Sequence, residues 1–192
     1  MANVLFVNAC VREHSRTLEL ARHVLSLWQA EAEEVKLYEC ALAPLDRKGM
    51  QMRDAAAAKK DFSDPMFTLA RQFAAAETVV IAAPYWDLMF PAVLKTYFEN
   101  ITVNGLTFAY GENGIPYGMC KAKKMIYVTT SGGPIFCNFG YDYVAALAKN
   151  FYGIQDVFFV SAQKLDIKGA DPKAILEQAK DAYTMKFEEI SK

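Results

Sequence analysis

The sequence predicts a doubly wound α/β fold, in which a parallel sheet carries helices on both faces. Five short runs that are rich in β-branched and apolar residues alternate with segments of helical pattern. Strands that alternate with helices form βαβ units, and such units build parallel sheets. No internal repeat or low-complexity linker interrupts the chain, so we expect residues 1–192 to form a single domain.

The first third of the chain predicts two strands and one helix. Residues 4–7 form an apolar, β-branched strand, and residues 17–29 follow with apolar side chains at helical spacing. Residues 35–38 predict the second strand. The polar and Ala-rich residues 43–63 predict a surface excursion, in which only the stretch "DAAAAKKD" has a helical composition.

The middle of the chain predicts a helix, a strand, a second helix and a hairpin. Asp64-Pro65 places a capping residue before a proline, which favours a helix over residues 66–76. Residues 78–83 are the most strand-like run, and residues 91–101 form a helix that again begins with proline. The stretch "NGLTFAYGENGIPYG" contains Asn-Gly and Glu-Asn-Gly turns between alternating apolar residues, which predicts a hairpin-like flap.

The last third predicts two further strands, each followed by a helix. Residues 125–130 and 157–162 are the strands. Residues 141–151 form the helix between them. Asp171-Pro172 begins a final helix that extends to about Lys186 or beyond.

Composition excludes several classes of function. Lys and Arg total 21 against 22 for Asp and Glu, and no block of like charge occurs, so we expect neither nucleic acid nor a membrane surface as partner. No apolar run approaches the roughly 18 residues of a membrane span, and the N-terminus lacks a signal-peptide pattern, so we expect a cytoplasmic protein. Four scattered cysteines and two histidines predict neither a metal site nor a disulfide scaffold.

Ligands of open parallel sheets bind beyond the carboxyl ends of the strands, so the loops after strands one, three and four are informative. The first loop lacks the glycine patterns of dinucleotide and P-loop sites. It places Ser15, Arg16 and Thr17 at a helix start, where amides, hydroxyls and the helix dipole favour a phosphate. Ordinary helix capping by Ser15 or Thr17 is the alternative.

The other two loops have features that suit a flat ring. In the loop after the third strand, Tyr85 and Trp86 lie between two prolines that stiffen the loop, so a planar heterocycle could stack there. A core or rim position for the two aromatic side chains is the alternative. The loop after the fourth strand has hydroxyls and two glycines that allow close backbone approach, although a plain turn would also explain them. A phosphate at one end and a hydrogen-bonded ring at the other indicate FMN.

Four stretches of the chain resemble the flavodoxin-like quinone reductases and FMN-dependent azoreductases: "VLFVNACVREHSRT", "VVIAAPYWDLMFPAVLKTYFENI", "GLTFAYGENG" and "KKMIYVTTSGGP". The similarity covers most of residues 1–165 in order. It implies strand order 2-1-3-4-5, a homodimer with one FMN per subunit, and ping-pong transfer of two electrons from NADH or NADPH to quinones or azo compounds.

The resemblance also implies the residues of the site, which form three segments. The phosphate segment contains His14, Ser15, Arg16 and Thr17, with Cys10 where the family often has serine. The ring would lie between two loops, which consist of Pro84, Tyr85, Trp86, Asp87 and Leu88 on one side and Thr130, Ser131, Gly132 and Gly133 on the other. With Trp86, three phenylalanines would form the walls for a flat acceptor: Phe90, Phe136 and Phe139.

Besides Cys10, the chain departs from the family at two further places, and two alternative functions stay open. Asp87 stands where azoreductases commonly have asparagine, and a carboxylate beside the flavin ring would change its hydrogen bonding and reduction potential. No histidine follows the Ser-Gly-Gly loop, so we assign no side chain as acid or base, with Tyr141 as a remote alternative. A flavodoxin-like electron carrier is disfavoured because those carriers are strongly acidic, whereas this chain is near neutral. An NAD(P)H-dependent FMN reductase and a non-catalytic FMN-binding protein remain the alternatives.

Overall fold

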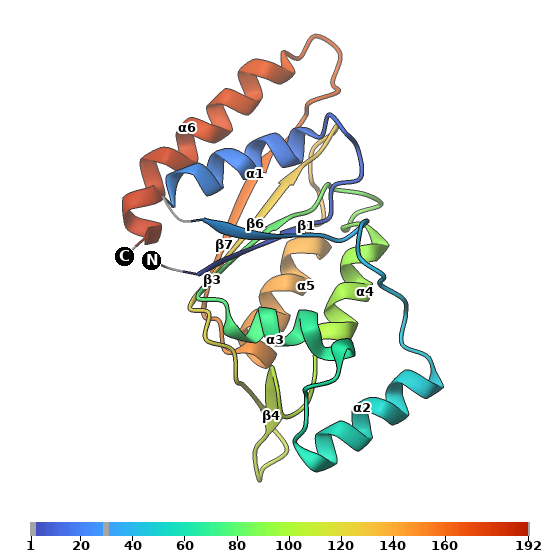
Figure 1. Ribbon diagram of the computed structural model, residues 1–192. Helices are drawn as coiled ribbons and strands as arrows, with labels where there is room; N and C mark the ends of the chain where they lie inside the picture. Colours follow the sequence, from blue (N-terminus) through green and yellow to red (C-terminus); the bar gives the residue numbers. More distant parts are fainter. Residues whose placement is uncertain (1–2, 29–30, 192) are drawn as a thin grey trace.

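The computed structural model describes residues 3–28 and 31–191, and its centre is a sheet of five parallel strands in the order β2-β1-β3-β6-β7 (Figure 1). Counting only these strands along the chain, the order is 2-1-3-4-5, as the resemblance implied. The strands are β1 (Val4–Asn8), β2 (Ala32–Lys36), β3 (Thr78–Ala82), β6 (Lys124–Thr130) and β7 (Asp156–Ala162). All four pairings are parallel and in continuous register, which confirms the predicted fold class.

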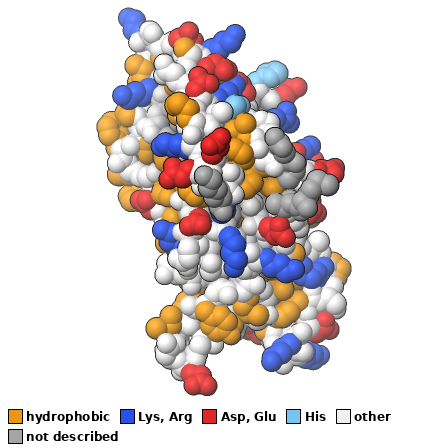
Figure 2. Space-filling model, turned by 90° about the vertical axis from the view of Figure 1, so that its left-hand side faces the viewer, with side chains coloured by type: hydrophobic (Ala, Val, Ile, Leu, Met, Phe, Trp, Pro, Cys, Tyr) orange, Lys and Arg blue, Asp and Glu red, His pale blue; other side chains and the backbone are white. Residues whose placement is uncertain are grey.

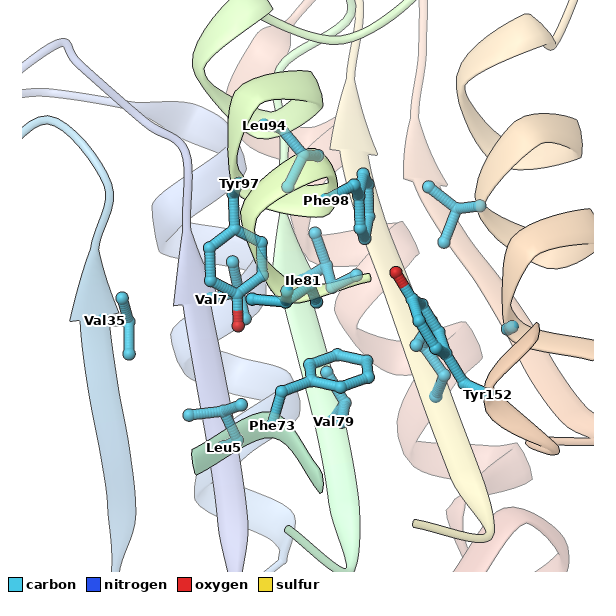
Figure 3. Packing of buried hydrophobic residues seen from close by; sticks show 14 of the residues in the cluster. Leu5, Val7, Val35, Phe73, Val79, Ile81, Leu94, Tyr97, Phe98 and Tyr152 are labelled. Atoms are coloured by element: carbon cyan, nitrogen blue, oxygen red, sulfur yellow. The ribbon is translucent and has the colours of Figure 1, made fainter. Parts of the chain in front are cut away.

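Helices cover both faces of the sheet, because alternate residues of each strand point to opposite sides. One layer contains α1 (Arg16–Leu27) and α6 (Pro172–Ser191), which pack on Val4 and Phe6. The other contains α3 (Thr68–Ala75), α4 (Ala92–Ile101) and α5 (Phe139–Leu147), which pack on the neighbouring residues Leu5 and Val7 (Figure 3). Two apolar cores therefore hold the sheet between the helix layers.

The excursion after β2 is more helical than its sequence indicated. Helix α2 spans Arg47–Lys59, begins at the capping residue Asp46 and ends at Lys60, whose φ of 52° lies in the left-handed region. None of its residues is buried, so it has no apolar stripe that periodicity could detect. Arg53 fixes the helix, because its Nη1 donates to the Glu99 carbonyl 2.8 Å away, near the end of α4.

Several predicted boundaries were shifted. The second strand lies at 32–36 rather than 35–38, because its backbone pairing with β1 includes the exposed charged residues of an edge strand. Helix α1 ends at Leu27, and the predicted end at Gln29 lies outside the described residues. Helix α3 follows a short 3-10 turn, and α5 continues as a π-helical turn, Ala148–Tyr152.

The predicted flap is confirmed as an antiparallel hairpin of β4 (Phe108–Tyr110) and β5 (Pro116–Gly118), at the bottom of Figure 1. Figure 2 shows acidic and basic side chains interspersed over one face of the molecule, in keeping with the near-neutral composition. Of the helices that the structure describes, none combines the length and hydropathy of a membrane-spanning segment.

Candidate functional site

The loops after β1, β3 and β6 meet at one cleft of about 290 Å³, at the carboxyl ends of the strands. The sequence predicted this meeting, because parallel strands bring their carboxyl ends to the same edge. The loop after β7 also borders the cleft, which the sequence analysis did not predict. The cleft is therefore enclosed by four loops that are distant in sequence.

The first wall of the cleft is the start of α1. Ser15 caps the helix, because its Oγ accepts from the Leu18 amide 3.2 Å away. The free amides of the first turn and the helix dipole make this end attractive to an anion. The predicted residues in this wall are His14, Ser15, Arg16 and Thr17. Arg12 lies beside them and adds a second guanidinium that sequence reasoning missed.

The second wall contains Pro84, Tyr85 and Trp86. The Tyr85 amide donates to the Thr130 carbonyl at 3.1 Å, and its hydroxyl donates to the Cys137 carbonyl at 2.9 Å. These two bonds tie the aromatic turn to the loop after β6. The aromatic pair is therefore held at the cleft by hydrogen bonds rather than buried in the core.

The turn that follows Trp86 has an unusual backbone. Trp86 and Met89 exchange two hydrogen bonds, of 2.9 and 2.8 Å, around Asp87 and Leu88. Both central residues have positive φ, 50° and 67°, a conformation that disfavours side chains with a Cβ and is strained for leucine. Neither of their amides donates to an acceptor within the described residues, so the turn presents two N–H groups.

The third wall is the loop after β6, where Thr130, Ser131 and Gly132 border the cleft. Thr130 is joined to the first wall by a buried hydrogen bond of 2.6 Å between its Oγ1 and that of Thr17. Ser131 is fixed through its amide, which donates to the Ala162 carbonyl at 3.0 Å. In the part of the chain that is described, the amides of Gly132 and Gly133 donate to no acceptor, so they remain available to a ligand.

The fourth wall, which the sequence analysis missed, contains Leu165 and Asp166. The Asp166 amide donates to the Gly132 carbonyl at 2.9 Å, and its Oδ1 lies 2.7 Å from Nη1 of Arg16. A Cβ built on Gly132 would come too close to Oδ2 of Asp166, so the carboxylate packs directly over this glycine and would have to turn aside for a larger residue. The fifth predicted strand ends at the same edge of the sheet as the other four. The sequence could therefore have indicated that the loop after it also borders the cleft.

The family model for the flavodoxin-like fold matches residues 2–187. The chain belongs to this flavodoxin-like family. An FMN-dependent NADH:quinone oxidoreductase of Coprothermobacter proteolyticus is 35% identical, over 95% of this chain and 96% of the relative. A protein of the same name from Lachnoclostridium phytofermentans is 31% identical, over 94% and 96%. The structure of a Bacillus anthracis FMN-dependent NADH-azoreductase in complex with FMN superposes with a TM-score of 0.81, at 22% identity over 100% of both chains.

Four of the predicted FMN-binding residues of this flavodoxin-like chain lie outside the cleft lining: Cys10, Asp87, Leu88 and Gly133. Cys10 lies near the start of the first loop, where its amide donates to Oδ1 of Asn8 at 2.9 Å. Burial raises the pKa of its thiol to about 11, so the thiol is neutral at physiological pH. Asp87 and Leu88 are exposed at the tip of the strained turn, which the hydrogen bonds between the flanking residues Trp86 and Met89 hold in shape.

The three phenylalanines of the expected acceptor pocket lie in different surroundings. Phe90 is only 5% exposed and packs against Phe98 and Tyr143, so the structure places it in the core rather than at the cleft. The Phe90 ring fills part of the apolar core between α4 and α5. Phe136 is 84% exposed and Phe139 is 54% exposed, on the segment after the glycine loop, but neither lines the cleft.

Proposed function

We propose that this flavodoxin-like protein is an FMN-dependent NADH:quinone oxidoreductase, which transfers two electrons from NADH to a quinone. One observation carries the proposal: an anion-binding helix start, an aromatic turn and a glycine loop border one cleft. The near-full-length relatives of that name support it. We extend the proposal to azo compounds as acceptors and to NADPH as an alternative donor.

The residues at the cleft fit the parts of FMN. A phosphate dianion suits the start of α1, where Arg12 and Arg16 are combined with the helix dipole. A flat ring suits the space between the aromatic turn and the glycine loop, since both present unpaired amides to ring oxygens and nitrogens. We therefore assign FMN binding to the three predicted segments, with contacts from Asp87, Leu88 and Gly133 made through their backbone.

Bound FMN would supply the two-electron chemistry itself. The chain would contribute position and dipoles: the helix start anchors the phosphate, the Tyr85-Trp86 pair covers one side of the ring, and the amides of Gly132 and Gly133 donate to its edge. None of these tasks requires a side chain that takes up or releases a proton. We assign no catalytic side chain for this reason.

We further propose that the chain acts as one FMN-binding domain and as a homodimer. The cleft volume of about 290 Å³ lies just below the range for ligand pockets, about 300–1,000 Å³, so a second subunit could complete it. Two aromatic side chains are uncovered on the segment after the glycine loop: Phe139 is 54% exposed, and Phe136 is 84% exposed. A second copy that covers this residue would supply the missing acceptor wall.

The test is an anaerobic visible spectrum of the purified protein with FMN. We expect NADH to bleach the flavin bands and added benzoquinone to restore them, because the two half-reactions are separate. A flavin that binds but is reduced by neither NADH nor NADPH would contradict the proposal and favour a carrier or binding protein. Rapid exchange of reduced flavin into solution would favour an FMN reductase.

A further inference from the structure

One ion pair joins two walls of the cleft. Arg16 is the first residue of α1, and Asp166 lies in the loop after β7, 150 residues further along the chain. Nη1 of Arg16 is 2.7 Å from Oδ1 of Asp166, and both residues line the cleft. The pair therefore spans the proposed phosphate end of the site.

The Arg16–Asp166 pair contributes little to folding stability. The two side chains are 41% and 65% exposed, and ion pairs between exposed groups add little to stability. Helix α1 is already held to the sheet and to α6 by fully buried residues such as Leu20 and Val24. A role in ligand binding is the better explanation.

The backbone of Asp166 is fixed, but its carboxylate is free to turn. The amides of Leu165 and Asp166 donate to the carbonyls of Ser131 and Gly132, at 3.2 and 2.9 Å. Within the described residues, Arg16 is the only donor to the carboxylate. Rotation of the carboxylate toward water would therefore break one exposed interaction and no other hydrogen bond.

Arg16 lies where a phosphate would compete with the carboxylate. The guanidinium is at the helix start, whose amides and dipole also attract an anion. A guanidinium binds phosphate through two parallel hydrogen bonds, whereas Asp166 uses one nitrogen of Arg16.

We propose that Asp166 is a positioning residue that competes with the cofactor for Arg16. Its carboxylate holds the guanidinium across the cleft, and it releases the guanidinium to the FMN phosphate when the cofactor binds. This inference rests on the proposed function. It adds that Asp166 lowers the affinity for a flavin with a phosphate and leaves the affinity for a flavin without one unchanged.

The test compares FMN with riboflavin, which has the same ring and ribityl chain but no phosphate. In Asp166→Asn, fluorescence titration should give an FMN Kd about tenfold lower, because a charge-assisted contact no longer competes. Stopped-flow release of FMN should slow, and the riboflavin Kd should not change. Asp156→Asn removes the same charge from the exposed start of β7, at the opposite end of the sheet, and should leave both Kd values unchanged.

The same substitution made in an Arg16→Gln protein separates competition for the guanidinium from direct repulsion between the carboxylate and the phosphate. In Arg16→Gln, the gain from Asp166→Asn should shrink to less than twofold, because no guanidinium remains to be released. An undiminished gain in that background would overturn the inference, as would weaker or unchanged FMN binding in Asp166→Asn alone, or an equal change for riboflavin. Wild-type protein that binds neither flavin would refute the proposed function as well.

Discussion

Trp86 is the side chain whose loss should most directly weaken flavin binding. Trp86→Ala removes an aromatic face from the cleft wall, and we expect the FMN Kd to rise about fivefold, since an aromatic contact contributes about 1 kcal/mol beyond its buried area. Titration of protein into FMN measures the change. Trp28→Phe is the control, because Trp28 bonds Tyr183 between α1 and α6, away from the cleft. Equal FMN affinity in wild type and Trp86→Ala would refute this assignment.

The four cysteines should differ in reactivity. Cys137 is exposed, whereas burial raises the pKa of Cys10 to about 11 and keeps its thiol neutral. Ellman's reagent at pH 8 should show one fast thiol, which Cys137→Ser removes and Cys10→Ser does not. Because the pKa of Cys10 is higher in the folded state, its contribution to stability is complete below pH 9 and falls as the pH rises toward 11. A fast phase that depends on Cys10 would contradict the burial.

The turn after β3 stores backbone strain that a glycine should relieve. Leu88 has φ of 67°, which costs about 1–2 kcal/mol for a residue with a Cβ, whereas glycine adopts it freely. We expect Leu88→Gly to raise the free energy of unfolding by about 1 kcal/mol, after the larger chain entropy of glycine is included. Urea unfolding measures the change. Leu88→Ala keeps the Cβ and should give no such gain, and a gain in both variants would exclude strain as the cause.

The hairpin of β4 and β5 packs against the π-helical turn so closely that no side chain fits at Gly118. A Cβ on Gly118 would collide with the backbone of Tyr152 and Gly153, which cannot move aside. We expect Gly118→Ala to lower the free energy of unfolding by about 3 kcal/mol. Gly133→Ala is the matched control, because its Cβ would meet open space. Similar thermal unfolding of the two variants would show that the flap is mobile rather than packed.

The assembly of the whole protein depends, we propose, on Phe136. Phe136→Glu places a charge in a surface that a second copy should bury, so we expect light scattering to give the mass of a monomer where the wild type gives a dimer. Met185→Glu is the control, because Met185 is 79% exposed on α6 and should not alter the mass. A wild-type monomer that turns over quinone would contradict the dimer proposal.

Much of the architecture followed from local patterns, but two kinds of feature did not. Strands β1, β3 and β6 were predicted to within one residue, because each is largely buried and apolar. Strand β2 was misplaced because backbone pairing, rather than hydrophobicity, determines where an edge strand begins. Helix α2 was missed in part because it buries no residue. Phe90 was assigned to the cleft because the sequence does not distinguish an aromatic side chain in the core from one in the wall of a cleft.

The sequence by itself determined the alternation of strands and helices, the capped start of α1 and the three loops that suit FMN, because these depend on residues close together in the chain. The tertiary structure decided which side chains border the cleft. The Arg16–Asp166 pair, the Thr17–Thr130 hydrogen bond and the contact of Asp166 with Gly132 join residues more than 30 positions apart. Such contacts arise only when the sheet brings the ends of its strands together, and no local pattern records them.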